Sequence, residues 1–153
     1  MRNKKKLLVE QLDTKLEPFF STTGIVIPPR GWINAVRTAI NMTMAQLGSK
    51  LDITKQGVKG IEDSEAAGTI SLKTLNEAAE ALDLKLVYAL VPKDGSFENL
   101  IDKNARRLAE KIVLRTHQNM QLENQGIEDK KIKKTIDELT DEFKREVRRS
   151  LWD

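Results

Sequence analysis

The chain has 153 residues and lacks cysteine altogether, and His117 is its only histidine. The absence of cysteine excludes disulfide bonds, thiol nucleophiles and thiolate metal ligands, and it fits a reducing cytoplasm. The lone histidine has no nucleophile or ligand set near it, so we expect a solvated side chain and predict no catalytic residue, metal or cofactor. The length suffices for a core and predicts one domain, or one domain with a helical extension.

Long apolar runs are missing as well. No run approaches the roughly 18 residues that a membrane-spanning helix requires. The start, Met1–Lys6, is basic, but Leu7-Leu8-Val9 is too short for the apolar core of a signal peptide. We therefore expect a soluble protein of the cytoplasm that does not bind membranes.

The charges are distributed unevenly, although the net charge is only +3. Residues 1–60 contain ten Lys and Arg against four Asp and Glu, whereas residues 61–101 contain three against eight. A basic first part followed by an acidic middle indicates one surface for phosphate and another for a different partner. Chance clustering in a charged, helical protein would give the same pattern.

Two helices are expected in the first 40 residues. The first covers residues 3–20, and Pro18 is expected to weaken its last turn. Its apolar side would hold Leu8, Leu12, Leu16 and Phe19 or Phe20. After a connector over residues 21–30, the second covers residues 31–40, with Trp32 as a core anchor or a surface aromatic. Its inner side would hold Ile33, Val36 and Ile40.

Residues 42–62 are the most informative stretch, because they can be read as two short helices that share one core. Thr43 is a suitable N-cap for the first helix, and Thr54 for the second. The inner positions at helical spacing are Leu47, Leu51, Val58 and Ile61. Lys55 and Gln56 are left outside, in the first turn of the second helix. Such a turn suits the major groove of DNA, although any pair of short amphipathic helices shares part of this pattern.

A further helix and a strand are expected next. Ser71 would cap the helix, whose inner side holds Leu72, Leu75, Ala78, Ala79 and Leu82. Leu84–Val91 begins with apolar and polar residues in alternation and becomes continuously apolar before Pro92, which predicts a strand. A lone strand needs a partner for its backbone groups. Its copy in a second subunit and the run Ile25-Val26-Ile27 are the two candidates.

Two long amphipathic helices are expected after the strand, over about residues 97–122 and 128–151, with Gln125-Gly126 between them. The first has a stripe of Ile101, Ala105, Leu108, Ile112 and Met120. The second has a stripe of Ile132, Ile136, Leu139, Phe143, Val147 and Leu151. Stripes of this kind suit a helical hairpin or a dimer seam.

The central pattern resembles a known type of DNA-binding protein. A Thr-capped helix, a tight turn, a Thr-capped helix ending in Ile61-Glu62 and then Ser71–Leu75 resemble the phage-repressor type of helix-turn-helix over about residues 31–84. Residues 28–33, 86–92 and 151–153 resemble the small bacterial family called mobile mystery protein A, which extends the resemblance to nearly the whole chain. Members of that family lie on mobile elements and are typically encoded beside mobile mystery protein B, a Fic-domain protein.

The resemblance implies a mainly α fold: a phage-repressor-like helix-turn-helix bundle with one short β-strand and a C-terminal helical extension. We expect an N-terminal helix and linker over residues 1–30 and a DNA-binding domain over residues 31–92 that ends in the strand. A C-terminal helical hairpin would occupy residues 93–153.

The resemblance also implies roles for particular residues. Thr54, Lys55 and Gln56 would form the first turn of a recognition helix, where Lys55 can bond guanine O6 and N7 and Gln56 can pair with adenine N6 and N7. Lys59, one turn later, would contact a base or a phosphate. The expected contacts to the DNA backbone are Thr43, Met44, Lys50 and Arg30.

Further expectations concern the ion pair, the second contact of the first capped helix and two glycines. Arg37 would form a structural ion pair with Glu62, because an Arg on the first helix of such repressors pairs with the Glu that ends the recognition helix. Met44 cannot donate a strong hydrogen bond, so only the backbone beside it would clamp a phosphate. Gly57 and Gly60 each weaken a helix by about 1 kcal/mol relative to Ala. Either a close approach to DNA or a helix that orders on binding would account for them.

Two functions remain after this reading. The first is a sequence-specific regulator, an autorepressor of a Fic-type gene pair that binds an inverted repeat in double-stranded DNA as a homodimer. The second is an antitoxin that neutralises a Fic-domain partner through its C-terminal helices. The inhibitory pattern Ser/Thr-x-x-x-Glu-Gly/Asn of some Fic antitoxins is absent, since Asp94 and Asn119 precede Glu98-Asn99 and Glu123-Asn124.

Overall fold

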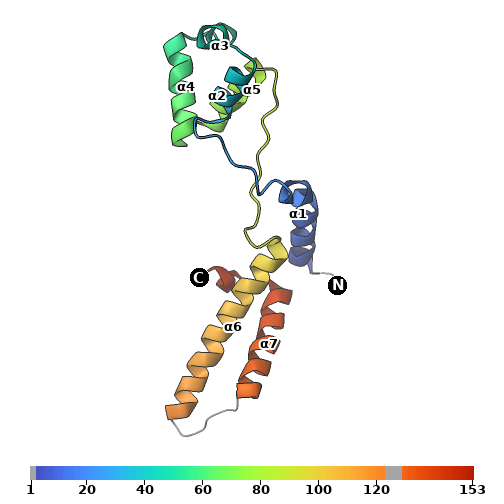
Figure 1. Cartoon of the computed structure of the whole chain (residues 1–153). Helices are drawn as coiled ribbons and strands as arrows, with labels where there is room; N and C mark the ends of the chain where they lie inside the picture. Colours follow the sequence, from blue (N-terminus) through green and yellow to red (C-terminus); the bar gives the residue numbers. More distant parts are fainter. Residues whose placement is uncertain (1–2, 123–128) are drawn as a thin grey trace. The chain divides into compact units, whose positions relative to one another are not determined.

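The computed structural model describes residues 3–122 and 129–153, and the fold is mainly helical (Figure 1). The helices are α1 (Lys4–Phe20), α2 (Trp32–Ala39), α3 (Met44–Leu51), α4 (Lys55–Ala67), α5 (Leu72–Ala81), α6 (Phe97–Leu122), α7 (Asp129–Glu146) and a short 3₁₀ helix, η1 (Arg149–Trp152). They belong to two compact units, residues 24–88 and residues 1–23 with 89–153. None of the described helices is long and apolar enough to cross a membrane.

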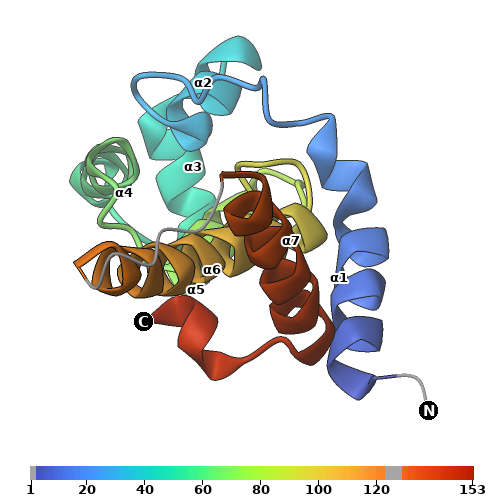
Figure 2. The same ribbon diagram turned by 90° about the horizontal axis from the view of Figure 1, so that it is seen from below.

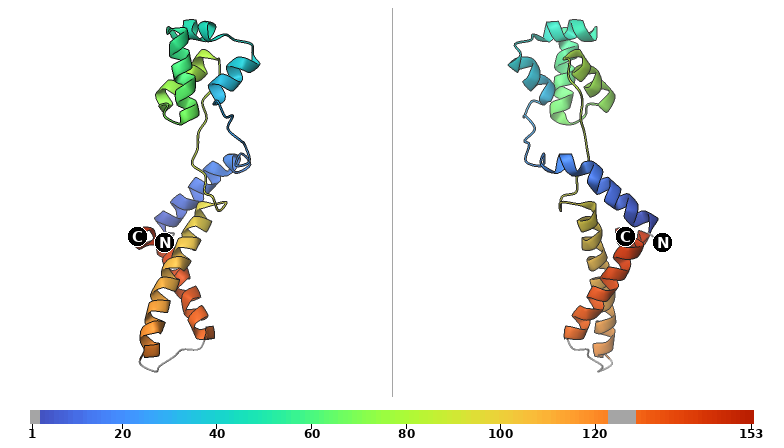
Figure 3. Two further views of the ribbon diagram at one scale, coloured as in Figure 1. Left: turned by 60° about the vertical axis from the view of Figure 1, so that its left-hand side comes forward. Right: turned by 90° about the vertical axis from the view of Figure 1, so that its right-hand side faces the viewer.

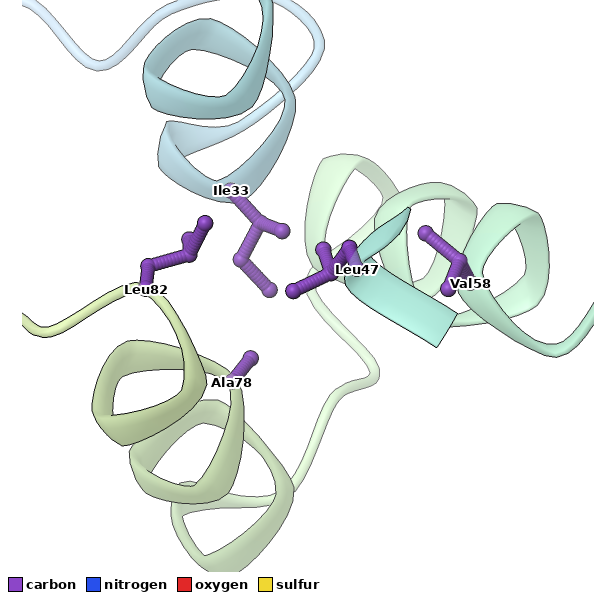
Figure 4. Close-up of a cluster of buried hydrophobic side chains, with 5 residues drawn as sticks. All are labelled: Ile33, Leu47, Val58, Ala78 and Leu82. Carbon is purple, nitrogen blue, oxygen red and sulfur yellow. The ribbon is translucent and has the colours of Figure 1, made fainter. Parts of the chain in front are cut away.

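The unit of residues 24–88 is a four-helix arrangement around one small core. Its fully or nearly fully buried apolar side chains come from each of its helices and converge in Figure 4: Ile33, Leu47, Val58, Ala78 and Leu82. All five were expected to face inward. Ile40 and Leu72, which were also expected inside, are more than half exposed, and Trp32 is 46% exposed and therefore a surface aromatic. Ile40 is the residue directly after α2, which ends at Ala39.

The predicted strand over Leu84–Val91 is wrong for the described chain. No strand forms within residues 3–122 or 129–153, and the segment between α5 and α6 has no regular secondary structure (Figure 1). Leu84 is still hydrogen-bonded to the end of α5, since its N–H donates to the carbonyl of Ala79 at 2.8 Å. The residues beyond it have strand composition but no neighbouring strand, and a strand cannot exist without a ladder.

The unit of residues 1–23 and 89–153 is built on an antiparallel hairpin of α6 and α7, which lie side by side in Figure 1 and cross one another in the left view of Figure 3. Its core consists of Ile101, Ala105, Ala109, Phe143 and Leu151. The two small residues of α6, both fully buried, let α7 approach closely. Four of these five belong to the expected stripes; Ala109 was not among them, and Ile112, which was, is 43% exposed.

Helix α1 joins this hairpin rather than standing apart as an N-terminal segment. It packs against α6 and α7, and Figure 2 shows its start beside the end of α7, where the Asn3 side chain donates to the carbonyl of Arg145. The carboxylate of Asp13 accepts hydrogen bonds from the N–H groups of Phe97 (2.7 Å) and Glu98 (3.2 Å). Helix α1 thus caps the first turn of α6. Leu8 and Leu12, expected on its packed side, are exposed.

The last predicted helix is interrupted. Helix α7 ends at Glu146 because Val147 adopts a left-handed conformation with φ of 45°, which a β-branched residue rarely does. The chain then reverses into η1, which returns Leu151 to the hairpin core. The side chain of Met120 and the break at Gln125-Gly126 lie outside the described residues.

Candidate nucleic-acid interface

Helix α3 starts from a complete capping box. The N–H of Gln46 donates to the Thr43 hydroxyl at 3.1 Å, and the Gln46 side-chain oxygen accepts from the N–H of Thr43 at 2.8 Å. This fixes the start of α3 and leaves the N–H groups of Met44 and Ala45 without helical acceptors, as in the first turn of any helix. Sequence reasoning placed the Thr43 cap but missed Gln46 as its reciprocal partner.

A three-residue turn joins α3 to α4, and Gly48 makes it possible. Asp52 takes a left-handed conformation with φ of 56°, and the N–H of Ile53 donates back to the carbonyl of Gly48 at 2.9 Å. A Cβ at position 48 would lie 2.7 Å from the carbonyl oxygen of Ile53, so only glycine allows the turn to approach α3 this closely. Sequence reasoning missed Gly48, although a glycine within an apolar helical pattern is the available signal.

The first turn of α4 is the exposed end of this arrangement. The Thr54 hydroxyl accepts from the N–H of Gly57 at 3.0 Å, while the N–H groups of Lys55 and Gln56 have no partner among the described residues. Both side chains are exposed, because Val58 turns inward and is completely buried. The turn therefore presents two backbone donors, an ammonium group and an amide on one surface.

Helix α4 is held from behind by a buried ion pair with α2. The guanidinium of Arg37 binds Glu62 through two hydrogen bonds, Nε to Oε1 at 2.5 Å and Nη2 to Oε2 at 3.2 Å. Asn34 donates to the same carboxylate at 2.9 Å, and the third donor of Arg37 reaches the carbonyl of Met42. The Glu62 side chain is only 4% exposed. This is the pair of residues to which the resemblance to phage-type repressors assigned a structural role.

The electrostatics of the pair favour its charged form. Burial raises the pKa of Glu62, but the hydrogen bonds from Arg37 and Asn34 together with the charge of Arg37 outweigh it, so the net pKa is below its ordinary value. The hydrogen bond to Glu62 raises the pKa of Arg37 in turn. A carboxylate this buried stays ionised only because its partners remain in place.

A second glutamate of α4 completes the contact with α2. Glu65 accepts hydrogen bonds from the N–H groups of Trp32 (2.5 Å) and Ile33 (3.1 Å), and so supplies the cap that Gly31 cannot provide. Gly31 has φ of 84°, and a Cβ there would lie 2.7 Å from the Glu65 side chain. Glu62 and Glu65 lie one helical turn apart, so both carboxylates face α2. Sequence reasoning found the first and missed the second.

The remaining candidate residues do not all gather at the start of α4. Lys50, in the last turn of α3, is exposed and close to it in sequence. Arg30 is farther away, because its neighbour Gly31 lies against Glu65 near the end of α4. At a rise of 1.5 Å per residue, Glu65 is about 15 Å along the helix from Lys55. Met44 is half-buried and packs against the apolar core, so its side chain does not reach outward.

Charges around this surface are balanced more evenly than the basic first part of the chain suggests. Lys59 is exposed but forms an ion pair with Asp63, with Nζ and Oδ2 2.8 Å apart. Three exposed lysines, at positions 50, 55 and 59, face two exposed aspartates, at positions 52 and 63. An exposed ion pair stabilises the protein little, so Lys59 can leave Asp63 for a phosphate group. The nearby aspartates nevertheless keep the non-specific attraction of this surface for a polyanion modest.

Comparison of the chain with protein-family models, with curated proteins and with solved structures found no match. The role of this surface must therefore be argued from its own residues. Its distinguishing property is a helix that the Arg37–Glu62 pair joins to α2 about two turns beyond the exposed first turn, with the preceding turn packed closely on Gly48.

Replacement of Arg37 or Glu62 by alanine is expected to destabilise the protein by about 3–5 kcal/mol, because each leaves the other charge buried without its partner. Urea unfolding followed by circular dichroism measures this loss. Lys59→Ala is the matched control, since it breaks an exposed ion pair on the same helix and should cost under about 0.5 kcal/mol. Equal effects of Arg37→Ala and Lys59→Ala would contradict a structural role for the buried pair.

The same pair predicts a loss of stability in acid. Because the folded-state pKa of Glu62 is lowered, its contribution is complete above the ordinary Glu pKa of about 4.3 and disappears as the pH falls through the lower folded-state value. The difference in unfolding free energy between wild type and Glu62→Gln should therefore be constant near neutrality and shrink below about pH 4.3. A difference that stays constant down to strongly acidic pH would count against the ion pair.

Two glycine substitutions should have opposite effects. Gly60→Ala is expected to stabilise the free protein by about 1 kcal/mol, because nothing lies within 4 Å of the added Cβ and alanine favours a helix. Gly48→Ala should destabilise it, because the added Cβ meets a backbone oxygen at 2.7 Å. Urea midpoints of both variants provide the measurement. A neutral Gly48→Ala would show that α3 and the turn are not in close contact.

Proposed function

We propose that α3, the turn and α4 form a helix-turn-helix and that the protein is a sequence-specific DNA-binding transcriptional regulator. The observation that carries the proposal is the first turn of α4, where Lys55 and Gln56 are exposed beside two free N–H groups on a helix fixed from behind. Groups of this kind must be held rigidly to tell one base from another. The proposal involves no catalytic residue, metal or cofactor.

In this proposal α4 enters the major groove with its N-terminal end. Lys55 contacts guanine O6 and N7, and Gln56 pairs with adenine N6 and N7. Thr54 and the free N–H groups of the first turn bind a phosphate at the groove edge. The start of α3 contacts the DNA backbone through its N–H groups near Thr43 and Met44, and the Met44 side chain stays in the core.

Other cations make contacts that do not depend on sequence. Lys50 lies next to the turn and is the best placed phosphate contact. Lys59 contacts DNA only if its ion pair with Asp63 breaks. Arg30 contacts DNA only if the DNA extends toward the end of α4, where the neighbouring Gly31 lies against Glu65. Because two aspartates reduce the attraction, base contacts supply a larger share of the affinity than in a strongly basic repressor.

The proposed target is an inverted repeat bound by a homodimer. One recognition helix reads only a few base pairs, so a second copy is needed to select a site in a genome. Half-sites would lie about 34 Å apart, or a multiple of that distance. In this proposal the site lies before the protein's own gene in a bacterial cytoplasm, and the protein is the autorepressor of a pair with a Fic-domain protein. The support for this part is the resemblance of the sequence to mobile mystery protein A.

A second candidate function is neutralisation of that Fic-domain partner through the C-terminal helices. Its support is the exposure of large apolar side chains on α6, Ile112 at 43% and Leu114 at 47%. Co-purification of the two proteins, with Ile112→Asn/Leu114→Asn as the altered variant, separates this role from DNA binding, because these residues lie outside the unit of α2–α5.

Lys55→Ala and Gln56→Ala are each expected to weaken operator binding by about 1–3 kcal/mol and to relax discrimination at one base pair. The physical reason is the loss of a bidentate contact to a single base. Gel shifts with DNA upstream of the protein's own gene and with scrambled DNA, at several salt concentrations, measure both effects. Lys111→Ala on α6 is the matched control and should leave binding unchanged.

Lys50→Ala provides the contrasting result. Loss of a phosphate contact should weaken operator and scrambled DNA alike and lower the salt slope by about one unit. If Lys55→Ala and Gln56→Ala also weaken both DNAs equally, α4 does not read bases. The neutralising function would then become the better explanation of the chain.

A further inference from the structure

Residues 85–91 form a largely exposed segment whose backbone N–H groups are unpaired. Leu84 donates its N–H to Ala79, and Pro92 has no N–H, whereas none of the seven N–H groups from Lys85 to Val91 has a hydrogen-bond acceptor within residues 3–122 and 129–153. The segment also exposes large apolar side chains, with Val87 at 61%, Tyr88 at 70% and Leu90 at 86%. Such a row of unpaired groups on an apolar segment is a template for another strand.

We propose that this segment pairs with the same segment of a second copy of the chain, as an antiparallel two-stranded ladder. The pairing would form the homodimer interface and does not depend on DNA binding. The other apolar run, Ile25-Val26-Ile27, is a poorer partner strand. It is three residues long, and Pro28 and Pro29, which follow it, have no N–H groups to donate. It also makes no hydrogen-bonded ladder with residues 85–91 in the structure.

The limits of the free segment determine the register. In a two-fold symmetric antiparallel ladder, residue pairs lie at equal distances on either side of the axis. Leu84 and Pro92 bound the free stretch, and its midpoint is Tyr88. Only a ladder with Tyr88 opposite its own copy pairs all seven residues, with Lys85 opposite Val91. Shifted registers leave residues unpaired at both ends.

The same register fixes the hydrogen bonds. In a two-stranded antiparallel ladder, only every second residue of a strand is hydrogen-bonded to the other strand. If the bonded residues are Lys85, Val87, Ala89 and Val91, each strand has four of them. If the residues between these are bonded instead, each strand has three. The first phase places Tyr88 in a pair without hydrogen bonds, where opposing Cα atoms lie about 4.5 Å apart.

The side chains of one face would then meet an apolar hollow. Leu86 lines a hollow of about 300 Å³ in the unit of α2–α5, together with Trp32, Val36, Leu75 and Ala79. Leu90 of the second copy lies opposite Leu86 in the Tyr88-centred register and is placed to cover this hollow. An isolated two-stranded ladder is marginal in water, so this apolar contact supplies stability that the backbone pairing lacks.

The chain offers a direct test because it contains no cysteine. Tyr88→Cys should form a disulfide-linked dimer under mild oxidation without DNA, since opposing Cα atoms about 4.5 Å apart lie within the range of a disulfide. Leu86→Cys and Leu90→Cys should not form such dimers alone, because each lies about 13 Å from its own copy along the ladder. A mixture of these two proteins should form the heterodimer. Non-reducing gels and mass spectrometry identify each product.

Native mass spectrometry and sedimentation at micromolar concentration test the uncrosslinked protein. Wild type and Tyr88→Thr should be dimers, and Tyr88→Lys should be monomeric because it sets two like charges opposite one another. Cross-linking of Leu86→Cys alone as readily as Tyr88→Cys, or a monomeric wild type, would overturn the proposal. So would an intrachain disulfide in Val26→Cys/Tyr88→Cys. None of these readouts uses DNA, so failure here leaves the DNA-binding proposal to its own test.

Discussion

The ion pair between Arg37 and Glu62 is the interaction on which the unit of α2–α5 depends most. Helices α2 and α4 each contribute one buried apolar side chain to the core, Ile33 and Val58. Two carboxylates of α4 add polar contacts between these helices: Glu62 binds the side chains of Arg37 and Asn34, and Glu65 caps the start of α2. Since α4 carries the exposed turn proposed to read DNA, the orientation of that turn depends on charged contacts farther along the same helix.

Local patterns in the sequence predicted the helix caps and core positions that depend on neighbouring residues. Thr43, Thr54 and Ser71 cap helices as expected, because a hydroxyl and the backbone two or three residues later form the cap without help from elsewhere. Core positions such as Leu47 and Val58 followed from spacing. The predicted strand failed because a strand requires a distant partner, and the last helix was predicted too long because nothing in the spacing reveals the left-handed turn at Val147.

The candidate site divides in the same way. Lys55 and Gln56 were placed correctly on the outside, because the inward direction of Val58 determines theirs. The cap by Glu65 and the close approach at Gly48 were missed, since both depend on contacts between helices. Arg30 was assigned to the interface from its position in the chain, but its neighbour Gly31 lies against the far end of α4. Its contribution to binding therefore depends on how far the DNA extends along the helix.

The cap that Asp13 places on α6 joins residues 84 positions apart in the chain. During synthesis, α1 leaves the ribosome before α6 and cannot acquire this partner until Phe97 and Glu98 have followed it. All residues of the unit 24–88 are synthesised in the interval, and its contacts lie within that stretch of chain. The segment that would carry the regulatory surface is thus able to fold before α1 meets its partner on α6.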